Sequence, residues 1–378
     1  MENNEMQRIR DEILRYLEEE GPKRGEQIAQ ALGLEAGVLS GVLEGLEDEG
    51  LLFCTRKERW ALPQTLGLLR GRLQGNARGF GFVIPEAGGE DLFIPADAMG
   101  GALHGDTVLA RITNAGRREG EIVRVLTHFN DVIVGTFELD GTASYVVPDE
   151  KRISMDVYVS KQDRMHARAD DKVVVRVTQW SSRGRNPRGR VIEVLGNKDD
   201  VGTDVRSLIR QHRLEEGFPE DVLNEANALP QEVAEGELAG REDLRVLNTF
   251  TIDGADAKDF DDAVSIERTA GGWRLGVHIA DVSHYVRPGT ALDGEALRRA
   301  TSVYLPGQVL PMLPEALSNG LCSLNPDVDR LTLTCMMEID RDGVVRSYRI
   351  FPSVIHSHAR LVYENVTRLL DEGDEAGF

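Results

Sequence analysis

Five aspartates crowd into the ten residues from Asp253 to Asp262, directly after the apolar stretch 247–252. Two like charges about 4 Å apart repel each other by roughly 4 kcal/mol at an effective dielectric near 20. Such a run cannot enter an apolar core without compensation, so it predicts a loop at the end of a strand with a cation among the carboxylates. Carboxylate oxygens favour Mg²⁺, and Mn²⁺ is a second fit.

The segments on either side of this run are typical of strands. The predicted strands are 248–252, 263–266 and 273–280. Adjacent strands would bring Asp253, the group 259–262 and Asp281 to one end of a sheet, where metal-assisted cleavage of a phosphodiester uses such carboxylates. A calcium loop fits poorly, because Val264 would occupy its acidic twelfth position. An acidic surface loop stays open as the alternative.

Length and composition limit the classes of protein. A chain of 378 residues has room for about two to four domains. No run of apolar residues is long enough to span a bilayer, and the acidic N-terminus lacks the features of a secretory signal, so we expect a cytoplasmic protein without membrane contact. The formal charge of −20 argues against nonspecific polyanion binding.

One segment of the chain has the opposite charge. Residues 183–190 contain four arginines and no acid, and these arginines are candidate contacts to an RNA backbone: Arg183, Arg185, Arg188 and Arg190. A solvated hairpin tip is the alternative for this segment.

The first 65 residues predict three short helices followed by two strands around the basic residues 56–59, which is a winged-helix pattern. Such a module binds nucleic acid or protein. The predicted third helix carries Glu35, Glu44 and Glu47, which disfavours reading of a DNA groove. The sequence does not favour either of two roles for this module: contact with RNA, or binding of a partner such as the ribosome or another protein.

Short alternating strands separated by glycines then predict two small β-barrels, at 66–128 and 129–198. In the first, Phe80 and Phe82 point to one strand face and Phe93 is expected beside them, as a stacking platform for bases. Core packing is the alternative. The pattern resembles the RNA-binding motifs of cold-shock domains. The second barrel lacks a Gly-Phe-Gly-Phe run, so its contribution is expected to be electrostatic more than stacking, through the arginines of 183–190 with Lys151 and Arg152.

Residues 251–263 closely resemble the catalytic signature of the RNase II/RNase R exoribonucleases, and three later blocks resemble that family too: 278–283, 301–306 and 317–326. The resemblance implies an α+β multidomain chain with a winged helix, two OB-fold (cold-shock) barrels and, at 199–378, the first part of an RNB catalytic domain. It also implies a monomeric, processive, Mg²⁺-dependent 3′→5′ hydrolase that releases nucleoside 5′-monophosphates from single-stranded 3′ ends and from structured RNA.

The same resemblance assigns residues. Asp253, Asp259, Asp261 and Asp262 match the four acidic positions, as catalytic residues and metal ligands, whereas Asp256 is expected to be solvated. The aromatics that hold the last bases of the RNA correspond to Tyr304 and Tyr363, for which core packing is the alternative.

The RNB domain of that family continues past the point that residue 378 reaches, with a catalytic arginine and an S1 barrel, so the chain is expected to be part of a longer enzyme. The main competing function is a noncatalytic RNA-binding or chaperone module. A DNA-binding regulator is the third and weakest.

Overall fold

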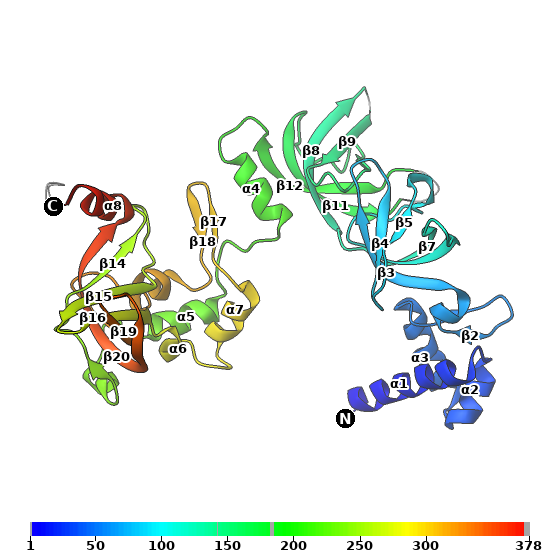
Figure 1. The fold of residues 1–378 in the computed structure, drawn as a ribbon. Helices are drawn as coiled ribbons and strands as arrows, with labels where there is room; N and C mark the ends of the chain where they lie inside the picture. Colours follow the sequence, from blue (N-terminus) through cyan, green and yellow to red (C-terminus); the bar gives the residue numbers. More distant parts are fainter. Residues whose placement is uncertain (1, 142, 182–184, 374–378) are drawn as a thin grey trace. The chain divides into compact units, whose positions relative to one another are not determined.

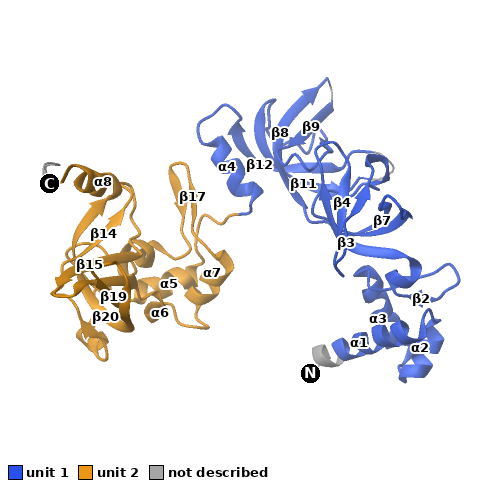
Figure 2. Ribbon diagram, viewed as in Figure 1, with its two compact units in different colours: residues 1–213 blue, residues 214–378 orange. Residues whose placement is uncertain are grey.

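The structure is a computed structural model that describes residues 2–141, 143–181 and 185–373. The chain divides into two compact units, residues 1–213 and 214–378 (Figure 2). Among the described residues, no helix is long and apolar enough to cross a bilayer.

The chain begins with three helices and a hairpin, in the predicted order (Figure 1). Their bounds are α1 (Glu2–Glu20), α2 (Gly25–Leu32), α3 (Ala36–Asp48), β1 (Phe53–Cys54) and β2 (Trp60–Ala61). Ile13 and Leu17, one turn apart on α1, and Leu46 of α3 are fully buried, so they form the centre of this module. Helix α2 ends at Gly33, whose φ of 66° suits glycine.

The first barrel closes in the order β3-β4-β5-β7-β6. Its strands are β3 (Leu68–Gly75), β4 (Gly81–Pro85), β5 (Leu92–Ile94), β6 (Thr107–Asn114) and β7 (Glu119–Thr127). Burial alternates along β4, where Val83 is buried and Phe82 and Ile84 are exposed. The strand therefore presents one face to the barrel core and the other, which carries Phe82, to solvent.

The second barrel closes in the order β10-β12-β11-β8-β9. Its strands are β8 (Val132–Asp140), β9 (Ala143–Pro148), β10 (Val157–Val159), β11 (Asp171–Gln179) and β12 (Arg188–Asn197). Helix α4 (Thr203–Gln211) contacts three of these strands, with Ile209 fully buried and Arg210 bonded to Glu193 at 2.8 Å. The sequence predicts that the catalytic domain begins at residue 199, but this helix belongs to the unit that contains the barrels, which ends at Arg213.

A buried carboxylate lies close to the junction of the two barrels. Asp106 is fully buried and accepts hydrogen bonds from the backbone N–H groups of Leu103 and Phe129, both at 2.9 Å. It also bonds Nδ1 of His128 at 2.9 Å, and that ring stacks on Trp180 with centroids 3.5 Å apart. Because Trp180 directly follows β11, Asp106 links the first barrel to the second.

We expect Asp106→Ala to lower the free energy of unfolding of the barrel unit by about 3 kcal/mol, because two buried N–H groups would lose their acceptor. Urea denaturation of the 378-residue chain measures this change. Asp97→Ala, at an exposed position of the same barrel, is the matched control and should leave the transition unchanged. Equal transitions for the two variants would contradict a structural role for Asp106.

The second unit is built on a six-stranded sheet of order β13-β20-β14-β15-β16-β19, in which β19 also pairs with β20. The strands are β13 (Glu242–Asp243), β14 (Thr249–Asp253), β15 (Asp262–Thr269), β16 (Gly272–Ala280), β19 (Asp329–Asp340) and β20 (Val345–Val362). The helices are α5 (Glu220–Ala228), α6 (Val282–Tyr285), α7 (Ala291–Arg299) and α8 (Tyr363–Glu372). Leu292 of α7 packs with Leu317, Leu324 and Ile355 in the core.

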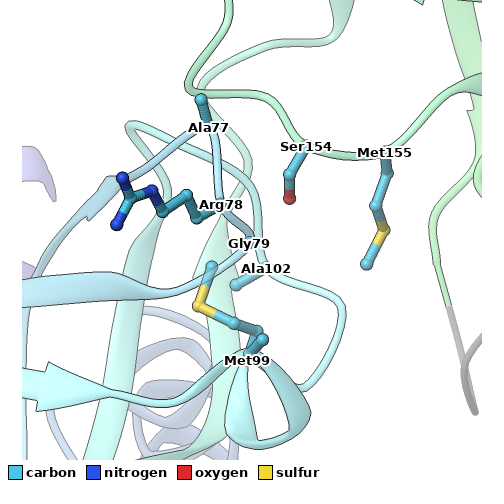
Figure 3. Close-up of a pocket in the computed structure, with 8 residues that line it drawn as sticks. Ala77, Arg78, Gly79, Met99, Ala102, Ser154 and Met155 are labelled. Atoms are coloured by element: carbon cyan, nitrogen blue, oxygen red, sulfur yellow. The ribbon is translucent and has the colours of Figure 1, made fainter.

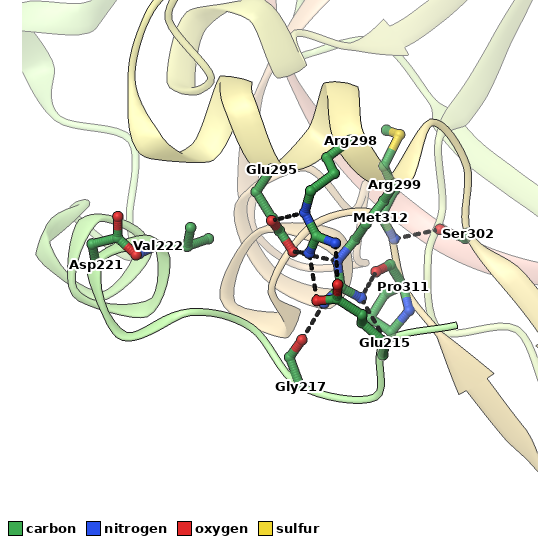
Figure 4. A network of polar contacts seen from close by, with 10 residues as sticks. All are labelled: Glu215, Gly217, Asp221, Val222, Glu295, Arg298, Arg299, Ser302, Pro311 and Met312. Atoms are coloured by element: carbon green, nitrogen blue, oxygen red, sulfur yellow. Dashed lines mark hydrogen bonds and ion pairs between the residues drawn. The ribbon is translucent and has the colours of Figure 1, made fainter. Parts of the chain in front are cut away.

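A hairpin of β17 (Val303–Leu305) and β18 (Gln308–Leu310) projects from this unit, and a polar network fixes its base (Figure 4). Glu295, only 6% exposed, accepts from Arg298 and Arg299 of the same helix. Arg299 also donates to Pro311 O at 3.1 Å, and Met312 N donates to Ser302 Oγ at 2.9 Å. These bonds hold both ends of the hairpin against α7.

Candidate active site

The two ends of the aspartate run lie on neighbouring strands, as predicted. Asp253 is the last residue of β14 and Asp262 is the first of β15. These strands pair antiparallel, with Thr249 opposite Ser265. Because the chain turns back between them, the loop 254–261 lies at one edge of the sheet and both terminal carboxylates belong to that edge.

The loop is held in place by a segment about sixty residues further along the chain. Ser323 Oγ accepts from the N–H of Phe260 at 3.0 Å and donates to the carbonyl of Lys258 at 3.1 Å. The N–H of Leu324 donates to Phe260 O at 2.9 Å, and the Phe260 side chain is only 3% exposed. One buried aromatic ring and three hydrogen bonds therefore stabilise the conformation of this loop, which the repulsion among its aspartates disfavours.

The carboxylates of this loop are incompletely compensated. Oδ2 of Asp253 is buried and has no hydrogen-bond partner. Burial, followed by repulsion from Asp262 and Asp259, raises the pKa of Asp253 above its usual range. The pKa of Asp261 is also raised, by burial first and then by the other three carboxylates. A partnerless buried carboxylate oxygen among mutually repelling acids fits the ligands that Mg²⁺ or Mn²⁺ requires.

Asp259 is engaged differently from the other carboxylates. The hydroxyl of Tyr304, in β17, donates a hydrogen bond to Asp259 Oδ2, and this bond helps raise the pKa of Tyr304 to about 12. Within the described part of the chain, no three His, Cys, Asp or Glu side chains converge on one point as a complete ligand set. The donor oxygens are gathered at one edge, and Asp259 is oriented by the tyrosine.

A cavity of about 740 Å³ lies between the aspartate loop and the hairpin. Asp253, Asp259, Asp261 and Tyr304 line it, together with Ser318 and Asn319 of a π-helical turn (η4, Ala316–Leu321). The side chain of Tyr304 is 64% exposed, which rules out core packing for this tyrosine. Tyr363 is 57% exposed and follows Val362, the residue paired with Asp253, so it begins α8 at the same edge of the sheet.

Arg360 is a residue of this site that the sequence analysis missed. It lies on β20, and its guanidinium donates to the carbonyls of Gly254 at 3.3 Å and Ala255 at 2.6 Å. The guanidinium lies over the ring of Phe260, 5.0 Å from the centroid, and its charge opposes the rise in the pKa of Asp253. No sequence signal marks Arg360, because only the parallel pairing of β14 with β20 brings it to the loop.

Two other aspartates lie outside the group of four. Asp281 was expected at the same sheet end, but its carboxylate bonds Arg241 at 2.6 Å and Ser283 at 2.9 Å. Its charge is thereby compensated, and it is not among the acids that raise the pKa values of Asp253 and Asp261. Asp256 is exposed, in agreement with a solvated position, although it borders the cavity.

The three phenylalanines of the first barrel form one cluster. Phe82 of β4 lies opposite Phe93 of β5, and the ring centroids of Phe80, Phe82 and Phe93 are 5.6–5.9 Å apart. Phe82 is 37% exposed, and the other two are half-buried, so the cluster lies on the outer face of the barrel. A pocket of about 330 Å³ lies nearby, lined by Arg78, Gly79 and Met99 and, from the second barrel, by Ser154 and Met155 (Figure 3).

The second barrel offers fewer free charges than its composition suggests. Arg190 pairs with Asp163 at 2.8 Å, and Arg152 is held by both oxygens of Glu150 at 2.7 and 2.8 Å. Arg185 and Lys151 are exposed, and Arg183 lies outside the described residues.

The same barrel also has an aromatic pair that the sequence analysis missed. The rings of Tyr145 and Tyr158 are 5.7 Å apart, and the guanidinium of Arg188 lies 5.5 Å from the centroid of Tyr158. The pair forms because β9 and β10 place Tyr145 directly opposite Tyr158. This surface therefore combines aromatic rings, on which a base could stack, with the positive charge of Arg188.

Three family models match consecutive parts of the chain. The ribonuclease B OB domain matches residues 71–125, the cold shock domain matches residues 145–219 and the RNB domain matches residues 241–377. The first covers most of the first barrel, the second runs from β9 of the second barrel to beyond α4, and the third includes the aspartate loop, the hairpin and α8.

Curated proteins and solved structures agree with these matches. The chain is 45% identical to ribonuclease R of Vibrio parahaemolyticus, over 97% of this chain and 45% of that protein. It is 42% identical to ribonuclease R of Acidithiobacillus ferrooxidans, over 96% of this chain and 84% of that one. Mycoplasma genitalium RNase R in complex with ribose methylated single-stranded RNA is 28% identical, with a TM-score of 0.75 over 82% of this chain and 50% of that one. The chain spans about half the length of most of these relatives.

Proposed function

Because the chain belongs to the ribonuclease R family, we propose that it forms the RNA-binding and metal-binding part of a processive hydrolytic exoribonuclease that shortens RNA from its 3′ end. The observation that carries this proposal is the carboxylate edge at Asp253–Asp262, with a partnerless buried oxygen and two acids whose pKa values are raised by burial and mutual repulsion. A surface that only binds RNA would gain nothing from collecting negative charge in this way.

Asp253, Asp261 and Asp262 are the residues that would hold Mg²⁺, or Mn²⁺ in its place. When bound, such an ion supplies the Lewis acidity and the activation of water that phosphodiester hydrolysis requires. The chain itself fixes the position of the donor oxygens through Ser323, Phe260 and Arg360. Water adds to the phosphorus and the bond to the 3′ oxygen breaks, so each cycle leaves a nucleoside 5′-monophosphate and a new 3′ hydroxyl.

The aromatic side chains around the cavity have a positioning role in this proposal. Tyr304 orients Asp259 through its hydroxyl and presents an exposed ring on which a base can stack. Tyr363 offers a second exposed ring beside the strand end that carries Asp253. The two rings would hold the last bases of the RNA and set the 3′ phosphodiester against the carboxylates.

The proposed substrate is single-stranded RNA with a free 3′ end, and structured RNA in addition. Mycoplasma genitalium RNase R has been solved with single-stranded and with double-stranded RNA, and the second of these structures has a TM-score of 0.63 and 29% identity over 74% of this chain and 48% of that one. In this chain the phenylalanine cluster of the first barrel and the pair Tyr145–Tyr158 of the second supply sequence-tolerant stacking surfaces. We propose that both surfaces hold the strand upstream of its 3′ end.

A 5′-labelled single-stranded RNA incubated with the full-length parent enzyme and Mg²⁺ tests the function. We expect a ladder that shortens from the 3′ end, release of 5′-monophosphates and complete inhibition by EDTA. The alternative is a noncatalytic RNA-binding or chaperone module, which predicts salt-dependent binding of intact RNA that EDTA leaves unchanged. Binding without shortening would therefore establish the alternative and reject hydrolysis.

A further inference from the structure

The N-terminal module contains a groove that the proposed nuclease function does not use. It has a volume of about 610 Å³ and lies between α2, α3 and the Trp60 side of the hairpin. Its apolar lining is Ala29, Leu34, Leu39, Leu43 and Trp60. Pockets of this size are large enough to take several side chains of a ligand.

The rim of this groove is acidic. Glu26 and Glu44 line it and are exposed, and Glu35 is exposed at the start of α3. Residues 25–50 contain six Asp or Glu and no Lys or Arg. Among the described residues, no ion pair compensates these three glutamates, whereas Asp48 and Glu49 of the same segment pair with arginines. The groove is therefore an apolar floor surrounded by uncompensated negative charge.

We propose that this groove binds a basic amphipathic helix of a partner protein. An apolar groove between two helices accepts the apolar face of a third, whose side chains recur at helical spacing. The lysines and arginines flanking that face would meet Glu26, Glu35 and Glu44, which favours a basic helix over a neutral or acidic one. A nucleic acid fits this groove poorly, because its phosphates would be repelled by the same glutamates and, among the described residues, no Lys or Arg lines the groove to neutralise them. The sequence left RNA and protein partners level for this module, and this geometry separates them.

A designed peptide with leucines at helical spacing and lysines elsewhere, carrying a fluorescent label, is the probe. Its binding to the 378-residue chain is followed by fluorescence anisotropy, so the test does not depend on nuclease activity. We expect saturable binding of this peptide. A scrambled peptide of the same composition should bind at least about tenfold more weakly, because only the designed sequence places its leucines on one helical face. Equal binding of the two peptides would mean charge attraction alone and would overturn the proposal.

Two variants locate the binding site. Glu26→Lys combined with Glu44→Lys reverses two rim charges and should weaken peptide binding by about tenfold or more. The control, Glu18→Lys with Glu19→Lys, makes the same charge change at exposed positions of α1. It should alter the affinity by less than about twofold. Ser40→Trp fills the groove from an exposed position without a charge change, and it should also weaken binding. The proposal is rejected if the two charge variants behave alike, or if Ser40→Trp binds the peptide as tightly as the unmodified chain does.

Discussion

Asp261→Asn in the full-length parent enzyme is expected to reduce the rate of RNA hydrolysis by about a thousandfold or more, which corresponds to at least about 4 kcal/mol in the activation free energy. Asp261 lines the cavity, and its carboxylate is repelled by three other carboxylates. An amide of the same shape fills the same space but lacks the charge that a divalent ion needs. Single-turnover hydrolysis of a 5′-labelled RNA at saturating enzyme measures this rate.

Asp256→Asn is the matched control, since it removes one charge from an exposed position of the same loop. It should retain most of the activity. RNA binding by Asp261→Asn, measured in EDTA, should stay near that of the unmodified enzyme because the barrels are untouched. A fully active Asp261→Asn variant would remove this residue from the proposed site.

Asp261→Asn, which is expected to lower activity, should raise the stability of the folded chain. The raised pKa values of Asp253 and Asp261 mean that the folded chain, without a cation, is penalised for holding these groups charged at neutral pH. We therefore expect Asp261→Asn to raise the melting temperature of the 378-residue chain in EDTA slightly, because solvent screens part of the repulsion at this exposed position. Adding Mg²⁺ should stabilise the unmodified chain more than the variant. An unchanged or lowered melting temperature would contradict strain among the carboxylates.

Phe82→Ala is expected to weaken binding of a single-stranded RNA oligonucleotide to the 378-residue chain by about tenfold, because one stacked base is worth about 1–3 kcal/mol. Phe82 is the most exposed ring of the cluster and contacts both Phe80 and Phe93, so its loss also opens the platform for its neighbours. Fluorescence anisotropy at fixed ionic strength measures the affinity. The unfolding transition should move little, since the ring lies outside the barrel core.

Ile84→Ala provides the comparison for this variant. Ile84 is exposed on the same strand and face, two residues beyond Phe82, but has no aromatic ring. It should bind RNA almost as tightly as the unmodified chain. If the two variants lose the same affinity, general apolar contact would explain the effect and stacking would not.

Local patterns predicted much of this fold. Helical spacing of apolar residues indicated the N-terminal helices, and glycine-separated alternation indicated two closed barrels, because both signals depend only on neighbours in the chain. The aspartate loop was predicted for a similar reason, since its flanking strands are also local. Helix α4 was assigned from sequence to the next domain, because the burial of Ile209 against the barrel strands depends on tertiary packing.

Some features of the candidate site were likewise predicted from sequence, and others were seen only in the structure. Sequence alone predicted that carboxylates gather at Asp253–Asp262 and that Phe80, Phe82 and Phe93 lie together, because crowded like charge and residue type are visible without a fold. Tertiary structure decided the rest: Arg360 supports the loop, Tyr304 bonds Asp259, and Arg241 takes Asp281 away from the group. Each of these contacts joins residues at least forty positions apart, so it depends on strand register and packing, which no local pattern records.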